Sequence, residues 1–242
     1  FPAYKAQREA TPEDIRASVP IIKDIITAMH IPVLQADGFE ADDVIGTLAT
    51  KAGEAGVQTY MLTPDKDYGQ LVRDNVFIFR PRHGGGYETM GPKEVCEKYE
   101  LNSPTQVIDL LALMGDSADN FPGCPGVGPK TATKLIAEFG SIDSILENSA
   151  KIKGKLREKV EGAVDDIRMS KFLATIRTDV PIDLDLDALK IQEPDTARLT
   201  EIFTELEFKS LLDKFVKKPQ QPQKTVNLQL DLFAENPTED AV

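Results

Sequence analysis

The feature that most constrains the fold is a change of pattern near Pro92. Before this residue, helix-like apolar periodicity alternates with short runs of β-branched and aromatic residues. Strands that alternate with helices are typical of a parallel sheet covered by helices, so the first part is expected to be α/β. Gly84-Gly85-Gly86 is typical of a hairpin turn. The expected helices and strands are, in order, 12–30, 32–36, 40–55, 57–62, 67–71 and 76–79.

Beyond Pro92 the strand signals fade and helical patterns dominate. After Phe215 the composition changes to a polar, Pro- and Gln-rich stretch that is typical of a linker. We therefore expect an α/β domain at 1–91, a helical domain at 92–216 and a flexible linker at 217–242. The expected helices of the second domain are 92–99, 104–114, 130–138, 141–147, 155–175 and 196–215.

The composition narrows the functional classes. The formal net charge of −12 argues at first against a nucleic-acid partner, although gathered carboxylates that hold cations reverse the local field. A basic run at 151–159 is most simply a solvated helix face. Two cysteines and two histidines are too few for a disulfide framework, a zinc site or catalysis centred on imidazole, so a reducing cytoplasm is expected. No apolar stretch is long enough for a membrane span, and residues 1–16 do not resemble a secretory signal.

Seven carboxylates occur in three short clusters, each at the junction of two expected elements. Each cluster has a structural alternative: the first can stabilise a helix start, the second can cap a short helix, and the third can be a solvated loop. Together they suggest one site, because several carboxylates cannot all stay ionised without cations between them. Hard oxygen ligands favour Mg²⁺ or Mn²⁺, and two such ions suit phosphodiester hydrolysis. The clusters are Glu40, Asp42 and Asp43; Asp65 and Asp67; Asp116 and Asp119.

A glycine-rich run from Gly123 to Gly128 leads through Pro129 into a helix that carries Lys130. Glycines let the backbone approach a ligand closely, and the N–H groups of a helix start can bind phosphate. Pro129 separates the last glycine from the lysine, so this is not a Walker loop. A plain helix–turn–helix corner is the alternative. We favour contacts to a phosphate backbone, which read no bases.

Taken in order, these motifs resemble the 5′-nuclease domain of bacterial DNA polymerase I and, more distantly, phage 5′-exonucleases and flap endonucleases. The resemblance implies a PIN-like, mostly parallel sheet flanked by helices, followed by a helical region with a helix–hairpin–helix motif. The matching motifs are Tyr4-Lys5-Ala6 with Arg8, Gly38-Phe39-Glu40-Ala41-Asp42-Asp43, Thr63-Pro64-Asp65-Lys66-Asp67, Gly115-Asp116-Ser117-Ala118-Asp119-Asn120 and Pro125-Gly126-Val127-Gly128-Pro129-Lys130-Thr131-Ala132. Two further matches extend the likeness to about residue 216: Arg177-Thr178-Asp179-Val180-Pro181 and Leu206-Glu207-Phe208.

The resemblance also implies roles for the matched residues. Two Mg²⁺ or Mn²⁺ ions would be held by the clusters, with Asp116 and Asp119 serving the second ion. Lys5 would reach the scissile phosphate, with Arg8 nearby at the base of a helical arch, and Tyr4 would stack on a base. The hairpin would grip duplex DNA, with its carbonyls around K⁺ or another monovalent cation. The ligands to one or both ions would be Glu40, Asp42, Asp43, Asp65 and Asp67, and the hairpin contacts would be Gly123, Gly126, Val127, Gly128, Lys130 and Thr131.

The activity implied by the resemblance is cleavage of 5′ ends and flaps on branched or nicked duplex DNA, which removes RNA primers and damaged strands in replication and repair. A monomer without a membrane partner is expected. The family carries an amino-terminal strand with an aspartate ligand, and a second acidic ligand, ahead of the Tyr-Lys pair, so the 242-residue chain is expected to cut weakly or not at all. The alternative is a truncated, catalytically weak DNA-binding module that is recruited to the sliding clamp. An RNase of the related PIN type ranks lower, because it gives no reason for the hairpin.

A short motif near the end of the chain indicates a possible binding partner other than DNA. Gln229-Leu230-Asp231-Leu232-Phe233 resembles the pentapeptide by which bacterial replication proteins dock on the sliding clamp. A chance apolar patch in a linker is the alternative, because five-residue motifs recur easily. The linker composition also favours a polymerase region beyond Val242.

Overall fold

The computed structural model describes residues 1–82 and 84–217. The described chain forms two compact units, the first from Phe1–Thr11 and Leu34–Leu186, the second from Pro12–Val33 and the described residues from Asp187 onward. The proposed linker after residue 217 and the pentapeptide Gln229–Phe233 lie outside the described residues. Across the described ranges, none of the helices combines the length and apolarity that a membrane span requires.

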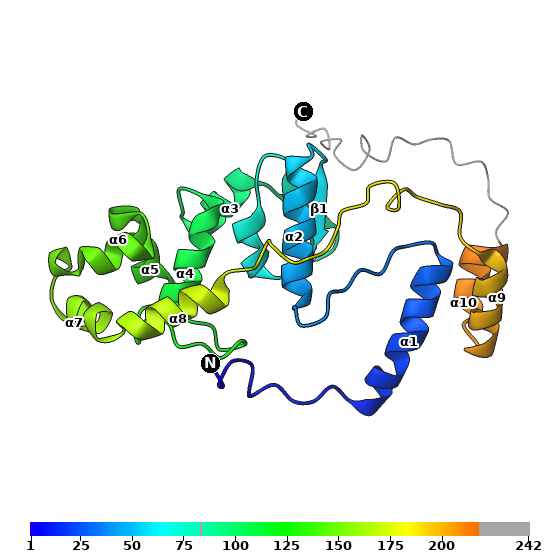
Figure 1. Cartoon of the computed structure of the whole chain (residues 1–242), viewed down its shortest axis with the longest axis horizontal. Coiled ribbons are helices and arrows are strands. Elements are labelled where there is room, and N and C mark those ends of the chain that lie inside the picture. Colours follow the sequence, from blue (N-terminus) through cyan, green and yellow to red (C-terminus); the bar gives the residue numbers. More distant parts are fainter. Residues whose placement is uncertain (83, 218–242) are drawn as a thin grey trace, which may run out of the picture. The chain divides into compact units, whose positions relative to one another are not determined.

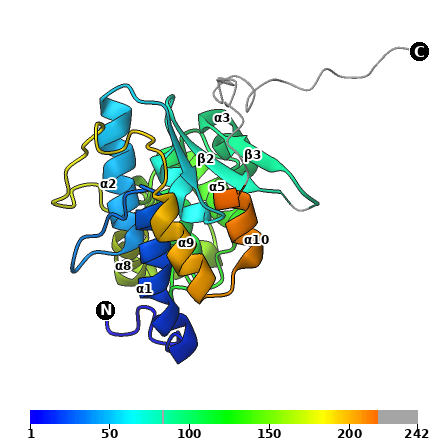
Figure 2. The ribbon, with the colours of Figure 1, turned by 90° about the vertical axis from the view of Figure 1, so that its right-hand side faces the viewer.

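The first unit contains a three-stranded sheet in the order β1-β2-β3. β1 (Thr59–Leu62) runs parallel to β2 (Val76–Pro81), with Thr59 opposite Val76. β3 (Tyr87–Met90) pairs antiparallel with β2 and is joined to it by a hairpin (Figures 1 and 2). The sheet is therefore mixed, with one parallel and one antiparallel pair in the described residues.

Most of the expected α/β elements are confirmed, and one is wrong. The strands expected at 57–62 and 76–79 and the turn at 84–86 are present, and Arg82 N–H donates to the Gly86 carbonyl at 3.0 Å in that turn. The strand expected at 32–36 is absent: these residues form no helix or strand, and Val33 and Leu34 are 40% and 44% exposed. An apolar run becomes a strand only where a neighbouring strand pairs with it, and no described strand does so here.

Two helices and one short 3₁₀ helix complete this part of the first unit. α2 (Ala41–Glu54) buries one apolar stripe that includes Val44, Ala49 and Ala52, as its helical periodicity predicts. α3 (Pro92–Tyr99) begins with the proline that suits a first helical position. The 3₁₀ helix Lys66–Leu71 follows β1, close to the expected 67–71.

The rest of the first unit is helical (Figure 1). Its central element is α4 (Val107–Met114), whose sequence is almost wholly apolar and whose Leu111, Ala112 and Leu113 are buried. α4 packs against α5 (Pro129–Phe139) and against α8 (Val164–Ala174). The helix expected at 155–175 is two helices, since α7 (Lys155–Gly162) ends before α8 begins. With α6 (Ile142–Glu147), these helices and the sheet share one hydrophobic core.

The second unit is a small helical cluster. α1 (Glu13–Ala28) packs against α9 (Thr196–Glu205) around Ala28 and Phe203. The single helix expected at 196–215 is interrupted at Glu207, where φ is +56°, before α10 (Lys209–Leu212).

Candidate metal centre and phosphate-binding hairpin

The first acidic cluster lies at the amino end of α2. Glu40 N–H donates to an Asp43 carboxylate oxygen at 3.4 Å, and Arg177 N–H donates to the other at 2.9 Å. Asp42 accepts a hydrogen bond of 2.7 Å from the Tyr68 hydroxyl. The helix-capping role weighed for this cluster is therefore present, and it also fixes the position of the carboxylates.

The second cluster follows the carboxyl end of β1. Asp65 caps the 3₁₀ helix by accepting from Asp67 N–H at 3.0 Å. Asp67 Oδ1 is buried and has no hydrogen-bond partner. Burial, reinforced by the negative charge of Asp65, raises the pKa of Asp67 to about 7. An orphaned carboxylate oxygen in this position is an atom that a bound cation would satisfy.

The third cluster lies in the loop after α4, where Asp116 and Phe121 form a short bridge. Asp116 Oδ1 accepts from the N–H groups of Ala118 and Asp119 at 2.7 and 3.2 Å. Asp116 Oδ2 accepts from Lys66 Nζ at 2.5 Å. Although burial alone would raise it, the pKa of Asp116 lies below its ordinary value because Lys66 and the loop N–H groups stabilise the carboxylate.

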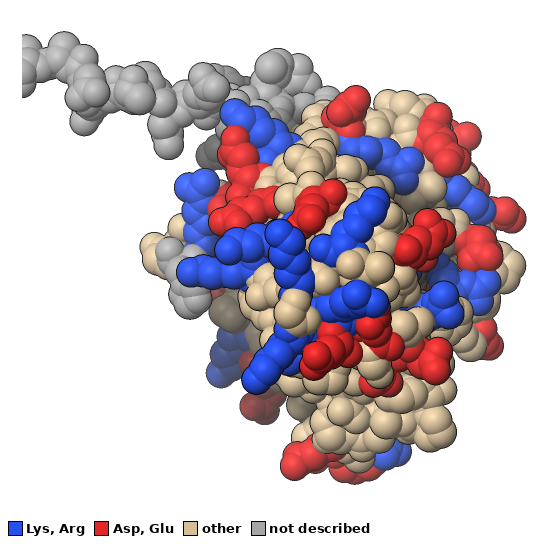
Figure 3. Space-filling model, turned by 90° about the vertical axis from the view of Figure 1, so that its left-hand side faces the viewer, with Lys and Arg blue, Asp and Glu red and all other residues tan. Residues whose placement is uncertain are grey.

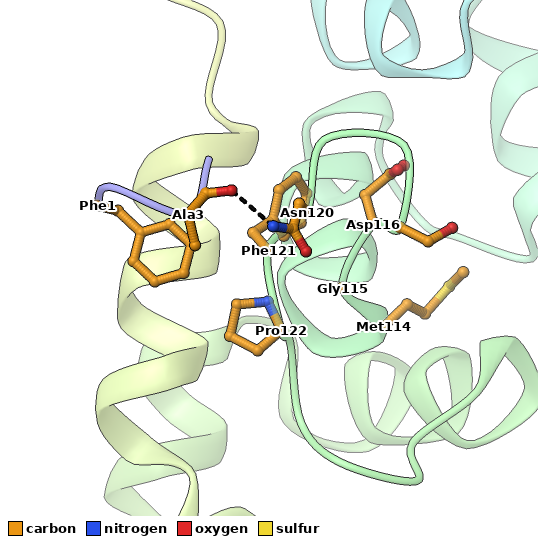
Figure 4. Close-up of a pocket in the computed structure, with 9 residues that line it drawn as sticks. Phe1, Ala3, Met114, Gly115, Asp116, Asn120, Phe121 and Pro122 are labelled. Atoms are coloured by element: carbon orange, nitrogen blue, oxygen red, sulfur yellow. Dashed lines mark hydrogen bonds between the residues drawn. The ribbon is translucent and has the colours of Figure 1, made fainter. Parts of the chain in front are cut away.

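The amino-terminal segment is tied to this loop. Asn120 Nδ2 donates to the Ala3 carbonyl at 2.6 Å, beside a pocket of about 450 Å³ that Asp116 also lines (Figure 4). Lys5 N–H donates to the Asp119 carbonyl at 2.9 Å. The Lys5 ammonium pairs with Glu40 and lies 3.8 Å from Asp119. Lys5 thus links the first and third clusters through charge.

Two more side chains of this segment reach the same carboxylates. The Tyr4 hydroxyl lies 3.4 Å from Glu40 and 3.5 Å from Asp119. Arg8 pairs with Asp119. The three residues expected to meet the substrate therefore lie at the acidic site.

Most of the expected ligands meet at one pocket of about 370 Å³. Asp65 and Asp116 do not line it, but their charges act on Asp67, which does. The oxygen donors are of the type that Mg²⁺ and Mn²⁺ prefer. As the side chains stand, however, no three Asp, Glu, His or Cys groups of the described chain are close enough together to hold a metal ion. The carboxylates at the pocket are Glu40, Asp42, Asp43, Asp67 and Asp119.

The glycine-rich hairpin is anchored to two helices. Gly123 N–H donates to the buried Ser170 hydroxyl of α8 at 2.9 Å, and Cys124 N–H donates to the Leu113 carbonyl of α4 at 2.8 Å. Gly123 also lies directly against the backbone of Gly115, which precedes Asp116. The hairpin and the third acidic cluster are therefore held by the same backbone contact.

The hairpin exposes backbone and basic side chains. Gly126, Gly128 and Lys130 are exposed, Thr131 is half-buried and Val127 is buried. Because Val127 packs inside, its side chain supports the hairpin and only its backbone could face a ligand.

The basic run lies beside the hairpin. The Lys159 ammonium of α7 is 3.5 Å from the Gly126 carbonyl. Figure 3 looks onto the face formed by α6 and α7 and shows Lys and Arg side chains gathered across it, with acidic side chains among them. The basic residues at 151–159 therefore form a solvated face, as expected from the sequence. One of them, Lys159, also reaches the hairpin.

Three site residues were not singled out from the sequence. Lys66 pairs with Asp116, and Tyr68 holds Asp42. Gln70 is buried, donates to the carbonyls of Asp67 and Ala174 at 2.9 Å, and so fixes the second cluster against α8. Lys66 lies inside a quoted motif, but its partner is 50 positions away and leaves no local signal.

Replacing Asp67 with asparagine should stabilise the metal-free protein at pH 8 by an amount on the order of 2 kcal/mol. The folded-state pKa of about 7 exceeds the ordinary 3.8, so the folded state binds this proton more tightly than the unfolded state does. Wild-type stability therefore falls as pH rises from about 4 to about 7, and Asp67→Asn loses that dependence. Urea denaturation in a chelator at pH 4 and pH 8 measures the difference. Equal stability of both proteins at pH 8 would contradict this assignment.

Solved structures of other proteins share this fold. Solved structures with a similar fold include the phage T5 5′-exonuclease with bound zinc (TM-score 0.62, 22% identity, 86% of this chain and 77% of that one). The catalytic core of Rad2 in complex with DNA substrate is also similar (TM-score 0.59, 19% identity, 86% and 72%). The fold is therefore the one shared by these nucleases.

The sequence comparisons identify the family. Residues 1–100 match the 5′-3′ exonuclease, N-terminal resolvase-like domain, and residues 102–197 match the 5′-3′ exonuclease, C-terminal SAM fold. The chain belongs to this 5′-3′ exonuclease family.

Bacterial DNA polymerases I contain similar segments. The thermostable enzyme of Thermus filiformis is 42% identical over 89% of this chain and 25% of its own length. The enzyme of Bacillus caldotenax is 36% identical over 99% and 28%. The chain thus spans about a quarter of the length of these relatives.

Proposed function

We propose that the chain is the 5′-nuclease part of a DNA polymerase I and hydrolyses DNA at 5′ ends and flaps by a two-metal mechanism. One observation carries the proposal: carboxylates from all three clusters surround a single pocket or act on its half-buried Asp67, with Lys5 beside them. The related T5 flap endonuclease has been solved with DNA and metal ions, and the Rad2 core with a DNA substrate. Those partners support the same class of substrate for this chain.

The proposed chemistry divides between bound ions and side chains. Two Mg²⁺ or Mn²⁺ ions, when bound, would activate a water molecule and stabilise the leaving oxygen. Lys5 and Arg8 would neutralise the phosphate that enters the pocket, since their charged groups already lie beside the carboxylates. Tyr4 would offer its ring to a base. Asp42 and Asp43, held by Tyr68 and Arg177, would keep their oxygens in place without reorganisation.

The hairpin would hold the duplex away from the chemistry. The exposed backbone around Gly126 and Gly128, with Lys130 in the first turn of α5, suits phosphate contacts that ignore sequence. A K⁺ ion at the hairpin carbonyls, RNA-primer removal and a monomeric state belong to the same proposal. We also propose that residues 1–91 form the catalytic domain and that residues 92–216 bind DNA. Docking on the sliding clamp would use Gln229–Phe233.

Replacing Lys130 with glutamine should weaken binding to flap DNA about three- to tenfold and lower the slope of log affinity against log salt by about 1. The loss should be the same for unrelated base sequences, because a phosphate contact carries no sequence information. Fluorescence anisotropy at several salt concentrations measures both quantities. Lys93→Gln, an exposed lysine on α3 that pairs with Glu97, is the charge-matched control. Equal affinities for Lys130→Gln and the control would remove the hairpin from the DNA interface.

A DNA-gripping module that does not cut is the second candidate. It is favoured by the lack, in the described part of the chain, of three carboxylates close enough to hold an ion. Dependence on metal separates the two functions: a nuclease cuts a 5′-labelled flap only when Mg²⁺ is present, whereas a module binds the same DNA with or without Mg²⁺ and leaves it intact.

A further inference from the structure

Both carboxylate oxygens of Asp116 are already engaged. Oδ1 accepts from two N–H groups of its own loop, those of Ala118 and Asp119. Oδ2 accepts from the Lys66 ammonium at 2.5 Å. The Asp116 side chain is only 7% exposed, so water supplies little of its solvation. Each oxygen of Asp116 therefore already has a partner inside the protein.

The two oxygens differ in how readily they can be released. Oδ1 is part of the loop geometry, because its two bonds fix the turn between Asp116 and Asp119. Oδ2 is held by a flexible lysine whose side chain is 45% exposed and can swing into solvent. A cation that binds Asp116 without rebuilding the loop must therefore take the place of the Lys66 ammonium.

We propose that Lys66 is a tethered counter-ion of Asp116, which a divalent cation must displace and which thereby sets the affinity of the Asp116 metal site. This inference rests on the proposed function. The negative groups that face Lys66 are Asp65, Asp67 and Asp116, and their fields all act on its ammonium. Without the lysine, this group of carboxylates holds one more uncompensated negative charge, which favours a divalent cation and disfavours the metal-free protein.

In this role, Lys66 stabilises the metal-free protein and weakens metal binding. A lysine that only supports the fold would not combine these two effects. Removing its charge should lower the stability of the metal-free protein, because Asp116 is left buried and unpaired. The same change should tighten metal binding, because the competing cation is gone. A lysine that only supports the fold would lower stability and would weaken metal binding or leave it unchanged.

The test is a Mn²⁺ titration of the full chain, in which electron paramagnetic resonance measures the concentration of free Mn²⁺. Lys66→Met should bind Mn²⁺ at the Asp116 site about tenfold more tightly than wild type, which corresponds to the loss of one close competing charge. Lys66→Arg keeps the charge and should stay within about threefold of wild type. Lys93→Met, which removes the same charge on α3, should leave Mn²⁺ affinity unchanged.

The outcomes separate the inference from the function on which it rests. If wild type binds Mn²⁺ and Lys66→Met binds it no more tightly, the inference is overturned while the metal site stands. If wild type shows no saturable Mn²⁺ binding that Asp116→Asn weakens, the proposed metal function fails as well. Circular dichroism confirms that each variant is folded, and Lys66→Gln, which keeps a polar end group, gives the same comparison should the methionine variant fail to fold.

Discussion

In a form of the protein that cuts 5′-flap DNA, alanine at Asp65 should lower Mg²⁺-dependent cleavage by at least about 10³-fold, with DNA affinity unchanged within about twofold. Asp65 follows the carboxyl end of β1, where open α/β sheets place their ligands. Its charge acts directly on Asp67, the carboxylate with the orphaned oxygen. Loss of this proposed ligand would remove charge that the reaction needs, whereas the proposed duplex-binding hairpin would be untouched. Gel assays of cleavage rate and anisotropy of binding measure the two effects on the same DNA.

Two controls separate the ligand role of Asp65 from its structural one. Asp65→Asn keeps an oxygen that can cap the 3₁₀ helix through Asp67 N–H, so it should fold normally and still lose activity. Asp74→Ala makes the same change at an exposed turn and should leave the rate unchanged. If Asp65→Asn cut at the wild-type rate, the cap would be the residue's main role and the metal assignment would be wrong.

Alanine at Gly123 should destabilise the protein by at least about 3 kcal/mol. A Cβ atom there would lie 2.2 Å from the Gly115 nitrogen and 2.6 Å from the Met114 carbonyl carbon, both of which belong to the backbone. The residue also has φ of +62°, which side-chain-bearing residues rarely adopt. No rotamer change relieves such contacts, so either α4 or the hairpin must move. Urea denaturation measures the loss.

The control for this variant lies five positions away. Gly128→Ala, in the same hairpin, places its Cβ where nothing lies within 4 Å, and its φ is −98°. It should change stability by less than about 1 kcal/mol. A similar small change at Gly123 would mean that the hairpin and the Asp116 loop are not held together by this close backbone contact.

Local patterns predicted most elements of the fold. The apolar stripe of α2, the apolar sequence of α4 and the glycine turn between β2 and β3 each determine a structure from residues near in sequence. The strand expected at 32–36 was wrong because pairing depends on a neighbouring strand, which an apolar run does not reveal. The division of 155–175 into α7 and α8 was missed because the apolar pattern continues across the break.

The carboxylates of the candidate site could be predicted from the sequence, but the side chains that hold them could not. Asp67, which follows the carboxyl end of β1, and Glu40, at the amino end of α2, line one pocket, as the clustering of carboxylates at element ends led us to expect. The ion pair between Lys66 and Asp116 was not predictable, because only the folded chain brings them together. The same holds for the Tyr68 hydroxyl, which a helix pattern marks only as a core residue.

The most direct test of the account is cleavage of a 5′-labelled flap DNA in Mg²⁺, beside a chelated control. It is run on this chain and on a form extended ahead of Phe1 by the amino-terminal strand that the family resemblance implies. We expect one or both proteins to cut near the flap junction, only when the metal is present, and we expect Asp65→Asn to abolish this cutting. If both proteins bind the flap and neither cuts it in Mg²⁺ or Mn²⁺, the acidic pocket is not a nuclease site and the central claim is wrong.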